Sequence, residues 1–173
     1  MNFRKATKED ISPIVEIYND IHTQEEMGLV TIGWVRDTYP TELDAQKALN
    51  RGDLFVGEDE GQIFGAAIIN QIQVDVYENA PWEYPAEARE VMVLHTLVIS
   101  PKAPRRGYGK AFVQFYQDWA SEHHCPYLRI DTNEKNTRAR AMYQKLGFRE
   151  IGMVPCDFNG IRSINLVLLE KKL

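Results

Sequence analysis

Residues 91 to 99, Val-Met-Val-Leu-His-Thr-Leu-Val-Ile, form an almost uninterrupted apolar run that is rich in β-branched side chains. Such a run is typical of a central β-strand covered on both faces. Pro101 ends it, and a loop from Ala103 to Lys110 follows. Residues 111 to 124 are predicted to form a helix. Aromatic side chains recur there at three- and four-residue spacing and mark one buried face: Phe112, Phe115, Tyr116 and Trp119.

The loop between this strand and this helix has the properties of an anion-binding site. Gly107 and Gly109 have no Cβ, so the backbone can turn sharply there and approach a ligand closely. The first amides of a helix have no partner within it, and the helix dipole adds positive charge at that end. The chain has a net charge of −5, yet this segment carries only cations: Lys102, Arg105, Arg106 and Lys110. We predict phosphate binding; the alternative is a solvated basic turn that needs its glycines only for shape.

The strand, loop and helix together resemble the acetyl-CoA signature of the GNAT N-acetyltransferase superfamily, whose loop reads R/Q-x-x-G-x-G/A. Gly107 and Gly109 match that pattern, while Pro104 stands where the family has its first Arg or Gln. A second stretch begins with Asn136-Thr137-Arg138-Ala139 and ends with Tyr143-Gln144-Lys145-Leu146-Gly147-Phe148. It is similar to the family's N-x-x-A…Y-x-x-x-G-F.

The resemblance implies the fold. The predicted element order, β-α-α-β-β-β-α-β-α-β-β, is that of the α/β (α+β) GNAT fold. That fold has a mixed, mostly antiparallel central sheet of about seven strands, splayed at its centre, with helices on both faces. We expect one N-acetyltransferase domain over residues 1 to 173, which is an ordinary length for a single core.

The resemblance also implies a site for acetyl-CoA. In the family, the pantetheine arm pairs with the backbone of the strand that precedes the loop, which here means Leu97, Val98 and Ile99. The pyrophosphate would meet the loop itself, that is Arg105, Arg106, Gly107, Tyr108, Gly109 and Lys110. Asn136 matches the family asparagine near the coenzyme A arm.

Two side chains are candidates for proton transfer. Tyr143 falls on the family's tyrosine position and is the candidate general acid toward the leaving thiolate; the alternative is a core tyrosine that only orients the sulfur. His95 is the candidate general base, because its unperturbed pKa near 6.5 suits proton transfer at neutral pH. The alternative for His95 is a buried histidine whose hydrogen bonds are satisfied. Glu90 is a reserve candidate for the base.

Two segments are candidates for the wall of an acceptor site. Residues 22 to 39 lie between the first two predicted helices, where the family often forms that wall; the alternative is ordinary packing on the sheet. Residues 75 to 90 are a long irregular insertion that carries acids and aromatic side chains, and both attract an ammonium group. Its alternative is a solvated surface loop whose aromatic side chains cover the edge of the sheet.

Composition limits the remaining possibilities. The acidic net charge argues against nucleic-acid binding, and no run of residues approaches a transmembrane span. Cys125 and Cys156 form neither a metal-type cluster nor a disulfide framework, so we expect no metal site and a cytoplasmic setting. We expect an acetyl-CoA-dependent N-acetyltransferase that acts on a primary amine of a small molecule or peptide by direct attack. The alternative is a non-catalytic acyl-CoA-binding regulatory module. A homodimer is compatible with the resemblance.

Overall fold

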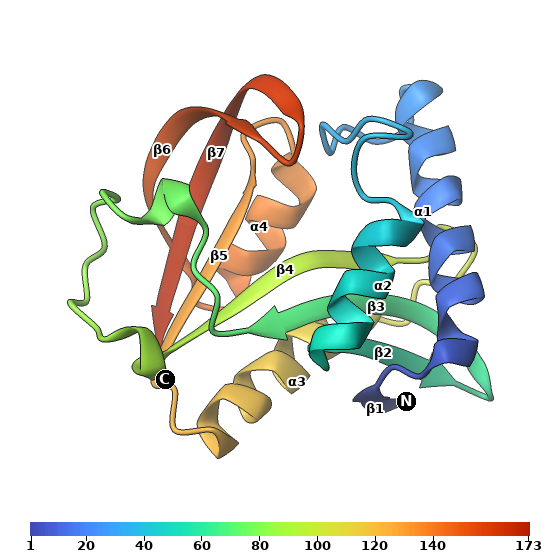
Figure 1. Ribbon diagram of the computed structural model, residues 1–173, viewed down its shortest axis with the longest axis horizontal. Coiled ribbons are helices and arrows are strands. Elements are labelled where there is room, and N and C mark those ends of the chain that lie inside the picture. The colour runs from blue at the N-terminus through green and yellow to red at the C-terminus, as the bar shows by residue number, and fades with distance from the viewer.

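The computed structural model describes residues 1–173 and contains one seven-stranded sheet with strands from both ends of the chain. The strands lie in the order β1-β2-β3-β4-β5-β7-β6, and only the β4–β5 pair is parallel. This is the predicted GNAT fold, with helices on both faces (Figure 1). The elements are β1 (Asn2–Lys5), α1 (Ile11–Glu26), α2 (Glu42–Arg51), β2 (Leu54–Asp59), β3 (Gln62–Asn70), β4 (Val91–Ile99), α3 (Tyr108–Glu122), β5 (Tyr127–Asn133), α4 (Thr137–Lys145), β6 (Arg149–Phe158) and β7 (Ile161–Lys172).

Helices cover the two faces of the β2–β4 half of the sheet, and alternation along the strands directs side chains to each face. Phe55 on β2 and Phe64 on β3 pack with α3, in the core that also contains Phe112 and Tyr143. Neighbouring residues on the same strands, among them Val56, pack with α1 and α2 in a second core. No helix of the structure is long and apolar enough to cross a membrane.

The insertion between β3 and β4 covers the part of the sheet that α1 and α2 leave open. Tyr77 is buried there in a third core with Val91 and Val93 of β4, and Trp82 packs against it. This segment is coloured green in Figure 1 and crosses in front of β6 and β7. The aromatic side chains of the insertion therefore cover a face of the sheet rather than its edge, and Tyr77 is buried rather than solvated.

Local contacts explain two of the strand ends. β3 ends at Asn70, where the Asn70 side chain accepts a hydrogen bond from the Ile72 backbone at 2.9 Å. β7 continues to Lys172, because its last residues pair with the start of β5. Asn159-Gly160 forms the turn that joins β6 to β7, with positive φ at both residues.

Candidate active site

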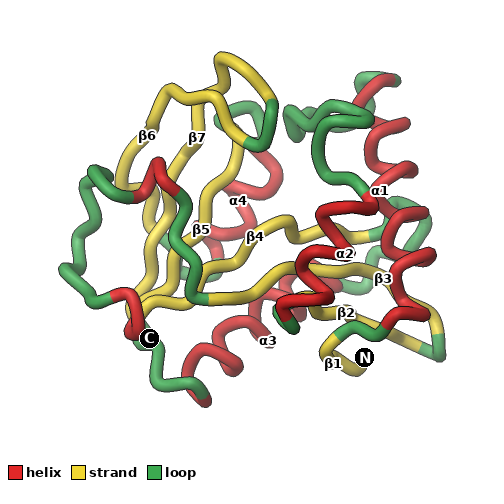
Figure 2. Tube along the Cα trace, viewed as in Figure 1, coloured by secondary structure: helices red, strands yellow, loops and turns green.

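The central feature of the site is a fork between β4 and β5. The two strands pair from Val91 with Tyr127 as far as Leu94 with Ile130, and beyond that pair they separate. A bulge lies in β4 just past the fork, where Thr96 has a φ of 48° and the register with β3 shifts. Figure 2 shows the two strands diverging while β4 stays beside β3. The edge of β4 that faces β5 therefore has free backbone groups after Leu94.

A cavity of about 1090 Å³ occupies this fork and extends to both faces of the sheet. Every site residue predicted from the sequence lines it, except the reserve base Glu90. On the strand and on the loop these are His95, Leu97, Val98, Ile99, Arg105, Arg106, Gly107, Tyr108, Gly109 and Lys110, and from the next helix Asn136 and Tyr143. Two motifs that lie far apart in the sequence thus meet at one cavity.

Gly65 on β3 allows the close backbone approach that this geometry requires. A Cβ placed on Gly65 would lie 2.5 Å from the backbone oxygen of Val98. We expect Gly65→Ala to displace that carbonyl and to lower the free energy of unfolding by about 1–3 kcal/mol, as overpacking does elsewhere. Urea unfolding would measure the loss, and a variant with an unchanged midpoint would contradict the close approach.

The loop end of the cavity offers backbone donors. Gly107 has a φ of 79° and precedes α3, and the amides of residues 107 to 110 make no hydrogen bond in the protein. Two of the predicted cations are engaged elsewhere: Arg106 lies 3.3 Å from Asp59, and Lys102 lies 2.8 Å from Asp20. Arg105 and Lys110 have no acidic partner.

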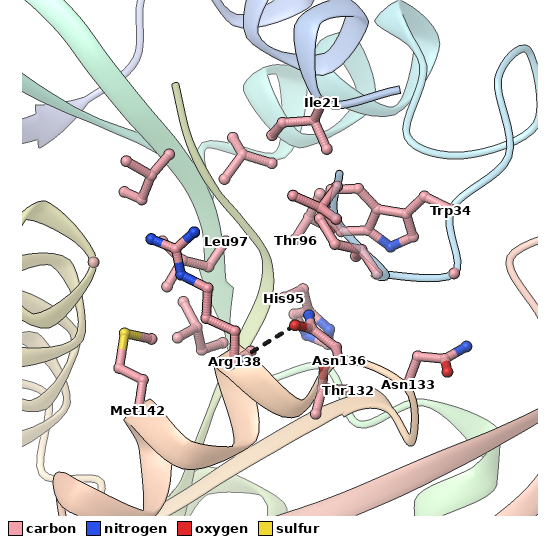
Figure 3. Close-up of a pocket in the computed structure, with 18 of the residues that line it drawn as sticks. Ile21, Trp34, His95, Thr96, Leu97, Thr132, Asn133, Asn136, Arg138 and Met142 are labelled. Atoms are coloured by element: carbon pink, nitrogen blue, oxygen red, sulfur yellow. Dashed lines mark hydrogen bonds between the residues drawn. The ribbon is translucent and has the colours of Figure 1, made fainter. Parts of the chain in front are cut away.

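Sequence reasoning missed two cations at this end of the cavity. Lys135 and Arg138 flank the start of α4 and line the cavity, and both are exposed without an acidic partner. Figure 3 shows the Arg138 side chain reaching from α4 toward Leu97 on β4. The signal was available, because both residues lie within two positions of Asn136. The Asn136 side chain itself accepts a hydrogen bond from the Ala139 amide at 3.2 Å and caps α4.

Tyr143 lies on the side of the fork that α3 and α4 cover. Its side chain is 5% exposed, and its hydroxyl makes no hydrogen bond within the protein. Burial, with a further contribution from the negative charge of Asp131, raises the pKa of Tyr143 well above its usual value. The phenol therefore stays protonated at neutral pH and can only donate its proton, as the acid role requires.

His95 is the first β4 residue beyond the fork, and a chain of side chains fixes its tautomer. Its Nε2 lies 3.1 Å from the Asn70 side-chain oxygen and 3.2 Å from the backbone oxygen of Ile72, both acceptors. The Asn70 amide group donates to Asp53 at 2.8 Å, which fixes the orientation of Asn70. Nε2 must then carry the hydrogen, and Nδ1 is left without a partner. Burial lowers the pKa of His95 to about 4, so at neutral pH the ring is uncharged.

Asp131 is the corresponding first residue of β5 beyond the fork, and sequence reasoning missed it. Leu94 and Ile130 pair with each other and both point into the α3 core. By alternation His95 and Asp131 point to the opposite side. Burial raises the pKa of Asp131 to about 6, and one hydrogen bond from Tyr77 opposes that shift. The available signal was an acidic residue directly after the apolar Ile130 within a predicted strand.

The side of the cavity away from the glycine loop is lined by both apolar and polar side chains. The segment between α1 and α2 lines it with Trp34 and Tyr39, and the tip of the β6–β7 hairpin adds Phe158 and Ile161. Residues of the segment 22 to 39 thus line the cavity, and their role as an acceptor wall stays a prediction. The insertion behaves differently from the acceptor wall that was proposed for it. Only Ile72 and Val74, which precede it, line the cavity, while Glu83 pairs with Arg149 at 2.6 Å on the surface.

Several known proteins resemble the chain. YiaC, a peptidyl-lysine N-acetyltransferase of Escherichia coli (strain K12), is 28% identical over 145 residues, which are 84% of this chain and 81% of that protein. A GNAT-family acetyltransferase structure from Streptococcus agalactiae superposes with a TM-score of 0.81 at 24% identity, covering 99% of this chain and 95% of that one. The structure of yncA from Salmonella typhimurium with its cofactor acetyl-CoA superposes with a TM-score of 0.70 at 19% identity, covering 100% and 94%.

The sequence pattern of the Acetyltransferase (GNAT) family matches residues 13–148. That span begins in α1 and ends at Phe148, so it contains the fork, the glycine loop and Tyr143. It also covers most of the chain, and the resemblance first noted between residues 94 and 148 is therefore confirmed. The chain belongs to the acetyltransferase (GNAT) family, whose members use acetyl-CoA.

Proposed function

We propose that the protein is an N-acetyltransferase that moves the acetyl group of acetyl-CoA to a primary amine of a small molecule or a peptide, by direct attack while both substrates are bound. The observation that carries the proposal is the arrangement at the fork. A proton-accepting carboxylate, Asp131, faces the acceptor side, and a protonated phenol, Tyr143, lies on the side of the glycine loop. The peptidyl-lysine activity of YiaC supports a lysine side chain as one acceptor.

The cavity fits acetyl-CoA at three places. The open edge of β4 after Leu94 offers backbone groups to an extended amide chain, and the free amides before and within the first turn of α3 suit a pyrophosphate. Arg105, Lys110 and Arg138 supply charge around that turn. When bound, acetyl-CoA supplies the acetyl group as a thioester.

The acceptor must reach the reaction as a neutral amine. For an ammonium of pKa near 10.4, losing the proton costs about 4.6 kcal/mol at pH 7. A base beside the amine makes that transfer fast, and a base works best when its pKa is close to the working pH. Asp131, with a pKa of about 6, meets that condition better than His95, with a pKa of about 4. We therefore assign the base role to Asp131, and His95 becomes a neutral hydrogen-bond acceptor for the amine.

The proton balance involves Asp131 and Tyr143. Asp131 takes one proton from the ammonium before attack and a second from the same nitrogen as the nitrogen–carbon bond forms and the carbon–sulfur bond breaks, and it passes both to solvent. Tyr143 gives its proton to the leaving thiolate and recovers one from solvent through the open cavity, so that one proton is released for each acetyl group transferred. The carbonyl oxygen gains charge as the bond to nitrogen forms, and a backbone amide on the open edge of β4 is the candidate donor to it.

A test of the function uses purified protein with acetyl-CoA and a panel of amines: lysine-containing peptides, free amino acids, polyamines and aminoglycosides. We expect release of free thiol that depends on one class of amine. Binding of acetyl-CoA with no release for any amine would instead support the regulatory binding module.

The cations of the loop end are tested by affinity for acetyl-CoA. We expect Arg138→Ala to weaken binding about tenfold or more, since a hydrogen bond to a charged group contributes about 1.5 kcal/mol or more. Arg106→Ala is the matched control and should have a smaller effect, because Arg106 already pairs with Asp59 and Glu60. Calorimetric titration measures both, and a larger loss in Arg106→Ala would contradict the placement of the cations.

A further inference from the structure

One contact joins the insertion to the fork. Tyr77, in a 3₁₀ turn at Asp75–Tyr77, donates its hydroxyl proton to Oδ2 of Asp131 at 2.7 Å. The Tyr77 side chain is 2% exposed and packs edge-on against Trp82, with ring centroids 4.9 Å apart. A tyrosine held this firmly gives the carboxylate little freedom to rotate.

The contact leaves one carboxylate oxygen unoccupied. Oδ1 of Asp131 makes no hydrogen bond within the protein, and Asp131 lines the cavity. The titratable groups that face the carboxylate come from four other elements: Tyr39 of the α1–α2 segment, Tyr77 of the insertion, Tyr143 of α4 and Cys156 of β6. His95 of β4 is the corresponding first residue on the other arm of the fork. All of these side chains are uncharged at neutral pH.

The cation two residues before Asp131 on the same strand is engaged elsewhere. Arg129 lies two residues before Asp131 on β5, but its guanidinium contacts Glu170 at 3.4 Å, the backbone oxygen of Tyr84 at 3.2 Å and the side chain of Gln73. Asp131 is therefore a carboxylate without a cationic partner in the protein. A ligand that carries an ammonium group would supply the missing charge.

We propose that Tyr77 is a positioning residue for Asp131: it occupies Oδ2 and holds Oδ1 toward the cavity, so that the insertion takes part in the site through one hydroxyl. The use of Oδ1 as the base toward the amine rests on the proposed function, whereas the hold of Tyr77 on the carboxylate does not. The other aromatic side chains of the insertion cover the sheet. Tyr77 covers the sheet with its ring and holds Asp131 with its hydroxyl.

The proposal predicts a direction for the titration of Asp131. A hydrogen bond donated to a carboxylate stabilises its charged form, so removing the Tyr77 hydroxyl raises the pKa of Asp131 further above its ordinary value. We expect an upward shift of about one unit in Tyr77→Phe, which keeps the ring and its packing. Tyr84→Phe is the matched control within the insertion, because the Tyr84 hydroxyl has no hydrogen-bond partner. The Tyr84 ring stacks on Tyr127 of β5.

The experiment is an NMR titration of protein labelled with ¹³C at the aspartate carboxyl carbons, without any substrate. Asp131→Asn identifies the Asp131 signal. The expected result is a midpoint near 6 in the parent protein, an increase in Tyr77→Phe and no change in Tyr84→Phe. An Asp131 midpoint that is the same in Tyr77→Phe as in the parent would overturn the proposal.

A second measurement needs no substitution. Protein made with 3-fluorotyrosine carries a more acidic hydroxyl at position 77, which donates more strongly and should lower the Asp131 midpoint. An unchanged or raised midpoint in that protein would also count against the proposal.

The activity arm separates this inference from the proposed function. With an amine that the enzyme accepts, kcat/KM is measured for Tyr77→Phe and for the parent protein at each pH. The titration of the amine affects both values equally, so it cancels in their ratio. The ratio should fall about fivefold at pH 6 and recover near pH 8.5, as a one-unit rise in the pKa of the base requires. A shifted NMR midpoint with no acetylated amine would leave the positioning role intact and refute the enzyme. A uniform loss of activity at all pH values, with the midpoint unmoved, would reduce Tyr77 to a structural role.

Discussion

Asp131→Asn is expected to lower kcat/KM for the acceptor amine by about 100- to 1,000-fold, within the range that general acid–base groups contribute. The amide keeps the size of the side chain and an acceptor for the Tyr77 hydroxyl, but it cannot take a proton. In the parent protein, activity should fall on the acid side with an apparent pKa near 6, and Asp131→Asn should lack that limb. A pH–rate profile of both proteins measures this.

His95→Gln is the comparison that separates the two candidate bases. If His95 were the base, the fall of activity on the acid side of the pH–rate profile would lie near pH 4 rather than near pH 6. The substitution of His95 would then abolish that fall. A parent profile with its limb near 4, abolished in His95→Gln and kept in Asp131→Asn, would reverse the assignment.

Asp131→Asn should also stabilise the fold. Because the folded pKa of Asp131 lies above the ordinary aspartate value of 3.8, ionising it in the folded protein costs stability as the pH rises through 3.8 to about 6. A shift of about two units corresponds to at most about 3 kcal/mol. Asp131→Asn should therefore gain up to that much free energy of unfolding at pH 8 and nothing from this source at pH 3. Loss of activity with gain of stability is the pattern of a functional residue.

Tyr143→Phe is expected to lower kcat by about 100-fold, the small end of the range for a general acid. The effect is limited because a thiol of pKa near 8.5 leaves as a thiolate without much assistance. Affinity for acetyl-CoA should not change, since the Tyr143 hydroxyl makes no hydrogen bond in the protein that could reorganise the cavity. Steady-state kinetics and calorimetric titration measure the two quantities.

The control for Tyr143→Phe is Tyr127→Phe, at the far end of β5, which removes a hydroxyl outside the cavity. It should leave kcat unchanged. Because the pKa of Tyr143 is raised above its usual value of 10, the parent enzyme should also show no loss of activity from this group below about pH 10. Equal turnover in Tyr143→Phe and the parent would exclude the acid role.

The sequence predicted the parts of the site that local patterns encode. The apolar run of β4, the glycines of the loop and the helical face that carries Tyr143 are all readable within one element. The two motifs also placed their residues at one cavity, because both belong to a family pattern that covers most of the chain.

The parts that it did not predict depend on contacts between distant residues. Arg106 pairs with Asp59, 47 positions away, and Tyr77 reaches Asp131, 54 positions away. Neither pairing leaves a local periodicity. The role of Asp131 follows only from the register of β4 with β5, which makes it the first residue of β5 after the paired segment ends. The lowered pKa of His95 likewise arises from burial, which no single strand reveals.

The central claim is that the cavity transfers an acetyl group to an amine nitrogen. The most direct measurement is mass spectrometry of lysine-containing peptides after incubation with acetyl-CoA and either the parent protein or Asp131→Asn, with the modified atom located by fragmentation. The account predicts an acetyl group on an amine nitrogen that accumulates with the parent protein and at least 100-fold more slowly with the variant. Equal accumulation with the two proteins, or acetylation at hydroxyl oxygens alone, would contradict it.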